Sequence, residues 1–195
     1  MLASITPLGE RGRQSTWWVT VSAFLIGSGV TGALVGALAG GAGAVLVPAS
    51  VGAQPRLAAL AISALAALAL DARGAVPGPV RQVNERWLDE YRGWVYGLGY
   101  GAQLGAGVLT VVTSAATYVA LVAALISGGA GRGAAIVGLY GLIRGLTPLA
   151  AARVRSPGQL VALHRALGRS RAIAARGGLL ALSAVLAVSV AGSIA

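Results

Sequence analysis

The chain of 195 residues is 56% hydrophobic and only 10% charged, with a formal net charge of +10 and a mean hydropathy of +0.79. A soluble domain carries about a quarter charged residues, and a disordered chain has low hydrophobicity, so the composition fits neither class. It predicts a single all-α integral membrane domain over residues 1–195.

Charge-free runs locate the predicted membrane spans. The first span covers residues 17–39, since about 20 apolar residues cross the hydrocarbon of a bilayer. The glycines from Gly40 to Gly43 are expected to end it. Pro48 and Pro55 then predict an irregular connection to the next span.

The second and third spans have unusual lengths. The second covers residues 57–70 and is closed by Asp71; because it is short, it is expected to recruit preceding residues or to lie in a locally thinned bilayer. The third covers residues 94–127, which is too long for one upright crossing. Glycines crowd its first half, so we expect a broken or tilted helix, or a re-entrant start.

The remaining predicted spans cover residues 133–152 and 177–195. The first of them is interrupted by Arg144 and Pro148. The count is therefore about five transmembrane helices.

The arginines, which are the only basic residues apart from the single His, predict the orientation of these spans. With the N-terminus inside and the C-terminus outside, the outer side holds only Arg56 and Arg132. The inner side holds twelve: Arg11, Arg13, Arg73, Arg81, Arg86, Arg92, Arg153, Arg155, Arg165, Arg169, Arg171 and Arg176. This distribution obeys the positive-inside rule and predicts a multi-pass protein of the cytoplasmic membrane. Anchoring near anionic headgroups accounts for the basic charge, so no nucleic-acid partner is expected.

Both predicted cytoplasmic loops have helical periodicity. Residues 80–94 place apolar and aromatic side chains at helical spacing, with Arg/Glu pairs four residues apart on other faces, which predicts an interfacial amphipathic helix. The second loop begins with the capping spacing Ser156 to Gln159 and a Pro at the first helical position. His164 lies beside its leucine stripe, and we expect a solvated or headgroup-facing imidazole. Residues 1–13 lack the apolar stretch of a cleaved signal peptide, so no cleavage is expected.

Arg144 is the most informative residue for function, because it falls near the middle of its span. A cation at that depth should face the protein interior and have partners. Tyr140, Arg144 and Thr147 share one helix face, and Pro148 frees the carbonyl of Arg144. Two interpretations stay open: Arg144 anchors an anionic substrate group or acts as a charge gate, or it ties carbonyls of a broken helix or snorkels to the interface.

Polar residues of the third span form a candidate surface facing Arg144. Gln103, Gly107, Thr110, Ser114 and Thr117 follow a spacing of three or four residues, flanked by Thr113 and Tyr118. The alternative is that these hydroxyls serve helix packing. The candidate substrate pathway consists of Arg144, Thr147, Tyr140, Gln103, Thr110, Thr113 and Ser114.

Glycine spacing predicts close contact between helices. Glycines recur every fourth residue at 32, 36 and 40, and again at 97, 101 and 105, and such motifs let helix backbones approach. They predict internal packing, and they also offer faces for self-association or for other membrane proteins. No strand precedes them, so a nucleotide-binding loop is not indicated.

The chemistry-bearing residues are few. The chain has no Cys, one His and five acidic residues, so no thiol relay can form within it and a metal site is not expected. Every acid falls in a predicted cytoplasmic segment, which excludes a Ser-His-Asp set in the membrane. We therefore expect neither enzymatic activity nor a cofactor.

Three stretches resemble the membrane domain of the CcdA and DsbD type, the cytochrome c biogenesis proteins of the broad LysE-like transporter assemblage. These are Tyr-Gly-Leu-Gly-Tyr-Gly-Ala-Gln-Leu-Gly at 96–105, Leu-Thr-Val-Val-Thr-Ser at 109–114, and Val-Gly-Leu-Tyr-Gly-Leu-Ile-Arg-Gly-Leu-Thr-Pro at 137–148. The family fold has two inverted three-helix repeats with the C-terminus outside, so five spans would correspond to that fold without its first helix. Family members that conduct electrons carry a Cys in each repeat, and Thr113 and Ser114 stand where the second is expected. The resemblance therefore implies a carrier or helper protein without thiol chemistry.

Two functions follow as hypotheses. The first is a small transporter-like protein that moves a small anionic solute past a midplane site at Arg144. The second is a non-catalytic accessory subunit of a larger membrane complex. The lipid bilayer is a partner in both.

Overall fold

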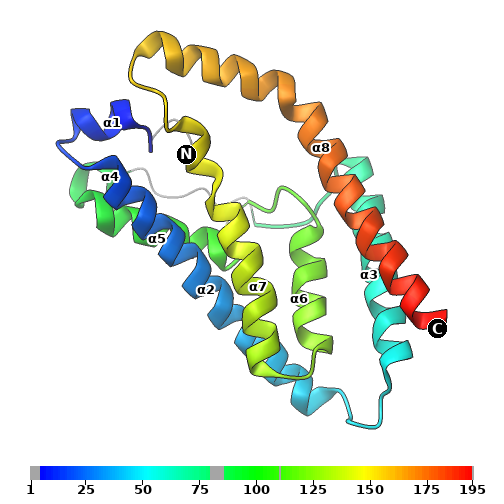
Figure 1. Cartoon of the computed structure of the whole chain (residues 1–195). Coiled ribbons are helices and arrows are strands. Elements are labelled where there is room, and N and C mark those ends of the chain that lie inside the picture. The colour runs from blue at the N-terminus through cyan, green and yellow to red at the C-terminus, as the bar shows by residue number, and fades with distance from the viewer. Residues whose placement is uncertain (1–4, 80–85, 110, 195) are drawn as a thin grey trace.

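The computed structural model describes residues 5–79, 86–109 and 111–194, and every regular element in those ranges is helical. The elements in Figure 1 are α1 (Pro7–Gly12), α2 (Trp17–Leu46), α3 (Ala53–Arg73), α4 (Trp87–Glu90), α5 (Gly93–Gly105), α6 (Ala116–Ile126), α7 (Ala130–Gly145), the 3-10 helix η1 (Thr147–Ala151) and α8 (Pro157–Ile194). The predicted all-α class is confirmed for these residues.

Four helical segments in the described ranges are long and apolar enough to cross a membrane: Trp17–Leu46, Ala53–Arg73, Ala130–Ala151 and Ile173–Ser193. They are the physical basis for treating the chain as a membrane protein, because each can satisfy its backbone hydrogen bonds internally within lipid. The number of crossings and their orientation stay predictions.

Helix α2 packs against α5, α6 and α7, and glycines let α5 and α7 approach its backbone closely. A Cβ atom added at Gly101 of α5 would lie 2.0 Å from the carbonyl oxygen of Phe24. Farther along α2, a Cβ at Gly36 would lie 2.1 Å from the carbonyl oxygen of Gly133 in α7. Contacts this close exclude any side chain, so the predicted role of the glycine motifs in helix packing is confirmed.

The same packing explains why α2 is longer than predicted. The glycines from Gly40 to Gly43 do not end the helix, which continues to Leu46. A Cβ at Gly40 would lie 2.3 Å from the carbonyl oxygen of Gly129, and one at Gly43 would lie 1.7 Å from that of Leu125. Tertiary contact with the end of α6 and the start of α7 thus outweighs the poor helix propensity of glycine.

Helix α3 corrects the predicted second span at both ends. It begins at Ala53, so Pro55 lies in the first turn instead of in an irregular connection. The ring is tolerated there because first-turn amides have no partner within the helix. Asp71 does not close the span either, since the helix continues to Arg73 and ends at Gly74, whose φ of 63° is left-handed.

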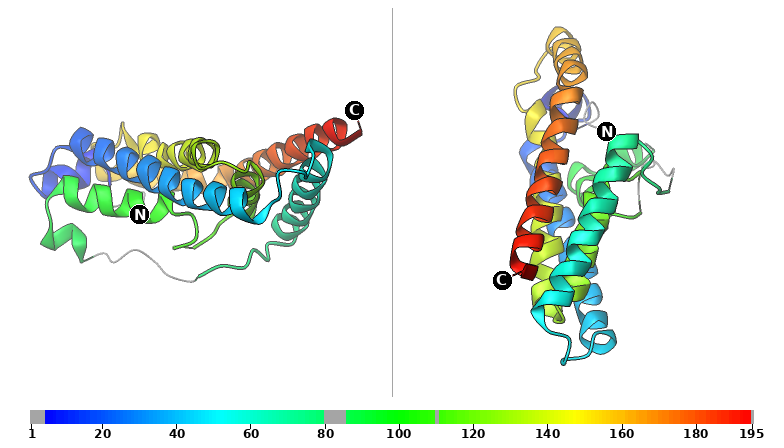
Figure 2. Two further views of the ribbon diagram at one scale, coloured as in Figure 1. Left: turned by 90° about the horizontal axis from the view of Figure 1, so that it is seen from below. Right: turned by 90° about the vertical axis from the view of Figure 1, so that its right-hand side faces the viewer.

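Helix α8 merges two elements that were predicted separately. The predicted second loop helix and the 177–195 span form one helix from Pro157 to Ile194. Its start agrees with the predicted cap, since Ser156 Oγ accepts a hydrogen bond of 3.4 Å from the Gln159 amide. Figure 2 shows the second half of α8 beside α3, at the far end of the molecule from α1.

The predicted amphipathic helix over residues 80–94 is not a single helix. Residues 80–85 lie outside the described ranges, and the remainder is divided between α4 and the start of α5 by Tyr91, which is extended. The bend brings α4 back over α5, so that the rings of Trp87 and Tyr100 stack with centroids 5.9 Å apart. Aromatic packing thus joins α4 to α5 across the bend.

Candidate functional site

The predicted 94–127 span is interrupted between α5 and α6. Helix α5 ends at Gly105 and α6 begins at Ala116. Gly107 has φ +75°, and a Cβ added there would lie 2.9 Å from Cγ2 of Thr117. Glycine is required at this position, because it alone adopts such a φ at no steric cost and leaves room for the first turn of α6.

Arg144 lies beside this break. Its Nη1 donates a hydrogen bond of 3.5 Å to the carbonyl of Leu104 in the last turn of α5. The guanidinium carbon is 5.6 Å from the centroid of the Tyr140 ring, within range of a cation–π contact. The Tyr140 hydroxyl lies 2.8 Å from Oγ1 of Thr117 in the first turn of α6. Arg144 and Tyr140, both half-buried, thus connect α7 to the two helix ends at the break.

The remaining predicted pathway residues are not gathered around the guanidinium. Thr147 Oγ1 donates to the carbonyl of Arg144, the acceptor that Pro148 was predicted to free. Gln103 is half-buried and Thr113 is exposed, and no described hydrogen bond joins either to Arg144. Ser114 contacts Asp71 instead, as described next, and Thr110 lies outside the described residues.

Helix α3 holds both ends of α6. One oxygen of Asp71 accepts from the Ala115 amide at 2.7 Å, and the other accepts from Ser114 Oγ at 2.7 Å. At the opposite end, Arg56 Nη1 donates to the carbonyl of Ile126 at 3.1 Å. An acid at a helix N-terminus and a cation at its C-terminus both oppose the helix dipole favourably. The sequence marks Asp71 only as a boundary of the second span, because its partner lies 44 positions away.

Ser28 fixes the three helices at the depth of the break. Its hydroxyl, fully buried, donates a hydrogen bond of 2.6 Å to the carbonyl of Gly141. A Cβ added at Gly105 would lie 2.1 Å from the Ser28 carbonyl oxygen. Ser28 of α2 therefore contacts the backbone of both α5 and α7 at this depth.

A second polar cluster, which sequence analysis missed, surrounds Glu10. This carboxylate is fully buried and accepts hydrogen bonds from the Tyr96 hydroxyl at 2.5 Å, Thr20 Oγ1 at 2.7 Å and Arg13 Nη2 at 2.9 Å. Burial lowers the pKa of Arg13, but its hydrogen bonds and charge interactions with Glu10 and Tyr96 together outweigh burial, and the pKa is raised. The cluster fastens α1 to α2 and α5. The sequence does contain a signal for α1, because Thr6 is its N-cap residue and is followed by a Pro at the start of the helix.

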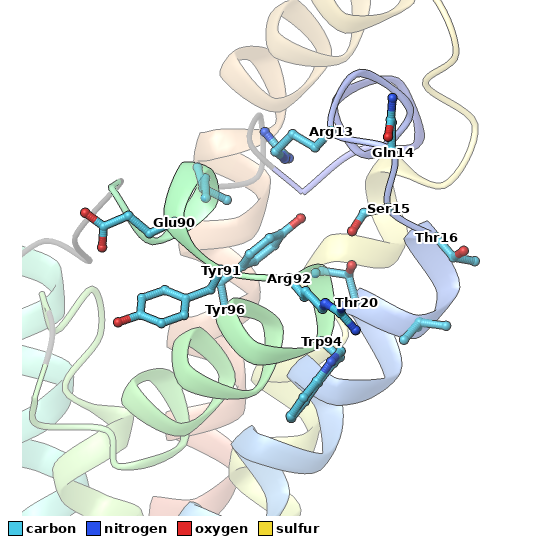
Figure 3. Close-up of a pocket in the computed structure, with 13 residues that line it drawn as sticks. Arg13, Gln14, Ser15, Thr16, Thr20, Glu90, Tyr91, Arg92, Trp94 and Tyr96 are labelled. Carbon is cyan, nitrogen blue, oxygen red and sulfur yellow. The ribbon is translucent and has the colours of Figure 1, made fainter.

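A pocket of about 710 Å³ adjoins this cluster. It lies between the turn that leads into α2 and the turn that leads into α5 (Figure 3). Arg13, Thr20 and Tyr96 belong to both the pocket wall and the Glu10 cluster. The pocket is thus a feature of the end of the bundle at which α2 and α5 begin.

The side chains of the types that ligate metals are scattered over the described ranges. These residues contain no group of three or more His, Cys, Asp or Glu side chains that could hold a metal ion. His164 is exposed, and its Nδ1 lies 3.0 Å from the carbonyl of Leu160 in its own helix.

Comparison with family models, curated proteins and solved structures finds no match to this chain. The resemblance to the CcdA and DsbD type therefore stays a prediction from the sequence.

Proposed function

We propose that this chain is a small multi-pass membrane protein of transporter-like architecture that binds a small anionic solute at the break between α5 and α6. The observation that carries the proposal is the environment of Arg144. It is a half-buried cation, and no carboxylate forms an ion pair with it among the residues that the structure describes. An uncompensated cation in a low-dielectric region favours an anion.

The hydrogen bonding of Arg144 supports the same proposal. A guanidinium has five N–H donors, and the described contact with Leu104 engages one of them at the long distance of 3.5 Å. The other donors suit the bidentate binding of a carboxylate or an oxyanion. Tyr140 and Thr117 add hydroxyls at the same depth.

The helix break is the second support. Discontinuous helices that meet inside the bilayer are a common transporter device, because their unpaired backbone groups bind solutes. Here the α5 C-terminus contacts Arg144 and the α6 N-terminus contacts Asp71. Each helix end is thus matched by a side chain of opposite charge, and an anionic solute bound to Arg144 would lie at this junction.

The proposed setting is the cytoplasmic membrane with the N-terminus inside. Its support is the distribution of the arginines along the sequence, since basic residues are retained on the cytoplasmic side. The solute would move without thiol redox chemistry, because the chain contains no Cys.

Uptake into proteoliposomes tests the proposal, with chloride, phosphate and acetate as probes. Arg144→Gln should abolish uptake of the transported anion, and Arg144→Lys should restore only part of it, since Lys keeps the charge but loses the planar donor fork. Arg132→Gln is the matched control, because Arg132 lies on the same helix and also makes a hydrogen bond of 3.5 Å to a carbonyl. Melting in detergent should be recorded for each variant.

Two results would contradict the solute site. Equal uptake by Arg144→Gln and the wild-type protein would remove Arg144 from the pathway. A large loss of thermal stability in Arg144→Gln, without uptake of any probe by the wild-type protein, would leave Arg144 as a structural tie to α5.

The alternative function is an accessory subunit, and the exposure of α8 favours it. Leu180 and Val188 are 71% and 72% exposed on this helix, which contacts mainly α3. The glycine faces of α2 and α5 pack on neighbours within the chain, and the α8 segment is the least buried of the four long apolar segments, so we propose α8 as the surface for a partner. Copurification from membranes in mild detergent tests this function, with Val188→Trp expected to release a partner that contacts α8.

A further inference from the structure

The first half of α8 is a helical segment that the bundle leaves largely uncovered. The 38 residues of α8 extend for about 57 Å along a helix axis, whereas the hydrocarbon of a bilayer is about 30 Å thick. Within α8, the segment Ile173–Ser193 is the part long and apolar enough to cross it. The second half of α8 packs beside α3 (Figure 2), which is the main contact of this helix. Residues 157–172 therefore need a different environment from the rest of α8.

This first half has two opposite faces. Leu160, Leu163 and Leu167 follow one another at spacings of three and four residues, so they share one face, and all three are half-buried. Arg165 and Arg169 each follow one of these leucines by two residues, which is about 200° farther around the helix, and both are exposed. The segment is therefore amphipathic, with leucines on one face and arginines on the other.

The arginine face carries a charge that the chain does not neutralise. Arg176, also exposed, extends this face, because it follows Arg169 by about two helical turns. Glu90 is the last acidic residue of the sequence, so α8 contains none. Among the residues that the structure describes, no carboxylate forms an ion pair with Arg165, Arg169 or Arg176. This face is therefore complementary to an anionic partner.

The orientation of the segment points to a membrane surface as that partner. Figure 1 shows the first half of α8 running across the end of the bundle where α1 lies, before the helix turns to run along α3. The segment continues directly into a candidate membrane span, which holds it close to the bilayer. A helix that lies in the interface buries its apolar face at the boundary of headgroups and acyl chains, so its basic face meets the headgroups. A bilayer surface thus accommodates both faces of this segment.

We propose that residues 157–172 form an in-plane helix that binds anionic phospholipid headgroups at the membrane surface. The three leucines enter the boundary between headgroups and acyl chains, and the arginine face binds the phosphate groups. The inference rests on the proposed membrane setting of the chain, but it is independent of a solute at Arg144. Failure of the uptake assay would therefore leave it standing, and failure of the experiments below would leave the solute site untouched.

Hydrogen exchange of the full chain in lipid nanodiscs tests the charge interaction. One set of nanodiscs contains phosphatidylcholine alone, and the other contains equal parts of phosphatidylcholine and phosphatidylglycerol. Residues 160–170 should exchange at least about fivefold more slowly in the anionic nanodiscs, because each arginine near an anionic surface changes the binding equilibrium by about that factor. High salt should remove most of this difference, since mobile ions screen the interaction.

Two arginine variants locate the interaction on α8. Arg169→Gln should lose about fivefold of the slowing in anionic nanodiscs. Arg132→Gln, which alters an exposed arginine in the first turn of α7, should retain all of it. Both side chains are exposed, so melting in detergent should be the same for the two variants. Equal exchange of residues 160–170 in the two lipids would overturn the proposal, and so would equal losses in the two variants.

Single cysteines report which face meets the lipid, because the chain contains no Cys of its own. Ser170 follows Leu167 by three residues and lies on the leucine side, whereas Ala162 precedes Arg169 by seven and lies on the arginine side. With a bimane label on Ser170→Cys, quenching by aqueous acrylamide in anionic nanodiscs should be severalfold weaker than with the label on Ala162→Cys. Equal quenching at the two positions would show that the segment stands in water, where an acidic protein is the alternative occupant, and would overturn the membrane assignment.

Discussion

Replacing Gly36 with Ala should destabilise the fold through one backbone contact. The added Cβ would lie 2.1 Å from the carbonyl oxygen of Gly133, whereas ordinary contacts begin at 3.4 Å, so α2 and α7 would have to separate by up to 3.4 − 2.1 = 1.3 Å. Overpacking of this kind costs about 1–3 kcal/mol, and the better helix propensity of Ala returns about 0.5–1 kcal/mol. Because the obstacle is backbone on a facing helix, no side-chain rotation relieves it. We expect a net loss of about 1–2 kcal/mol.

Gly41→Ala is the matched control for this prediction. It is the same substitution on the same helix, but its Cβ would meet only the Cβ of Ala130 at 4.0 Å, so it should be neutral or stabilising by about 0.5–1 kcal/mol. In a detergent melt, Gly36→Ala should therefore lie about 4–8 °C below Gly41→Ala. Equal melting temperatures for the two variants would refute the close approach of α2 and α7.

Three further predictions address the polar contacts and the topology. Glu10→Gln should lower the free energy of unfolding by about 2–4 kcal/mol, because a buried carboxylate with three donors loses its charge. The control Glu90→Gln alters an exposed acid and should change the free energy of unfolding by less than about 0.5 kcal/mol. Similar losses in both variants would contradict the Glu10 cluster. Asp71→Ala should cost about 1–2 kcal/mol and speed hydrogen exchange at the first turn of α6, whereas unchanged exchange there would show that α6 does not depend on α3. A Cys introduced at Ala130 should react with an impermeant thiol reagent from outside intact cells and one at Gln159 should not, so labelling at Gln159 would overturn the proposed orientation.

Part of the candidate site was predictable from local patterns. Arg144 stands out because a cation within an apolar run is rare, and Pro148 predicts a free carbonyl that Thr147 does contact. The glycine density after residue 93 predicted a broken or tilted helix, or a re-entrant start, and the helix is broken, although the break follows the glycines of α5 instead of falling among them. These features depend on residue type and short spacing, which the sequence displays directly.

The partners of these residues were not predictable in the same way. Asp71 contacts Ala115, and Glu10 contacts Tyr96, across 44 and 86 positions. The residues next to Asp71 in the sequence do not show whether its side chain caps another helix or only ends its own apolar run. Glu10 lies outside every apolar run, so its complete burial follows only from the packing of α1 against α2 and α5.

Composition and apolar run length alone determined that the chain forms helices long and apolar enough to cross a membrane, because both follow from the free energy of transferring side chains and backbone into lipid. The C-terminal end of α2 and the partners of Asp71 and Glu10 were decided by tertiary structure. At those places the local preference of glycine, proline or polar residues is weak, about 1 kcal/mol or less for glycine in a helix. Backbone contacts such as that of Gly43 with Leu125 form only when distant segments meet, and their combined energy exceeds that preference.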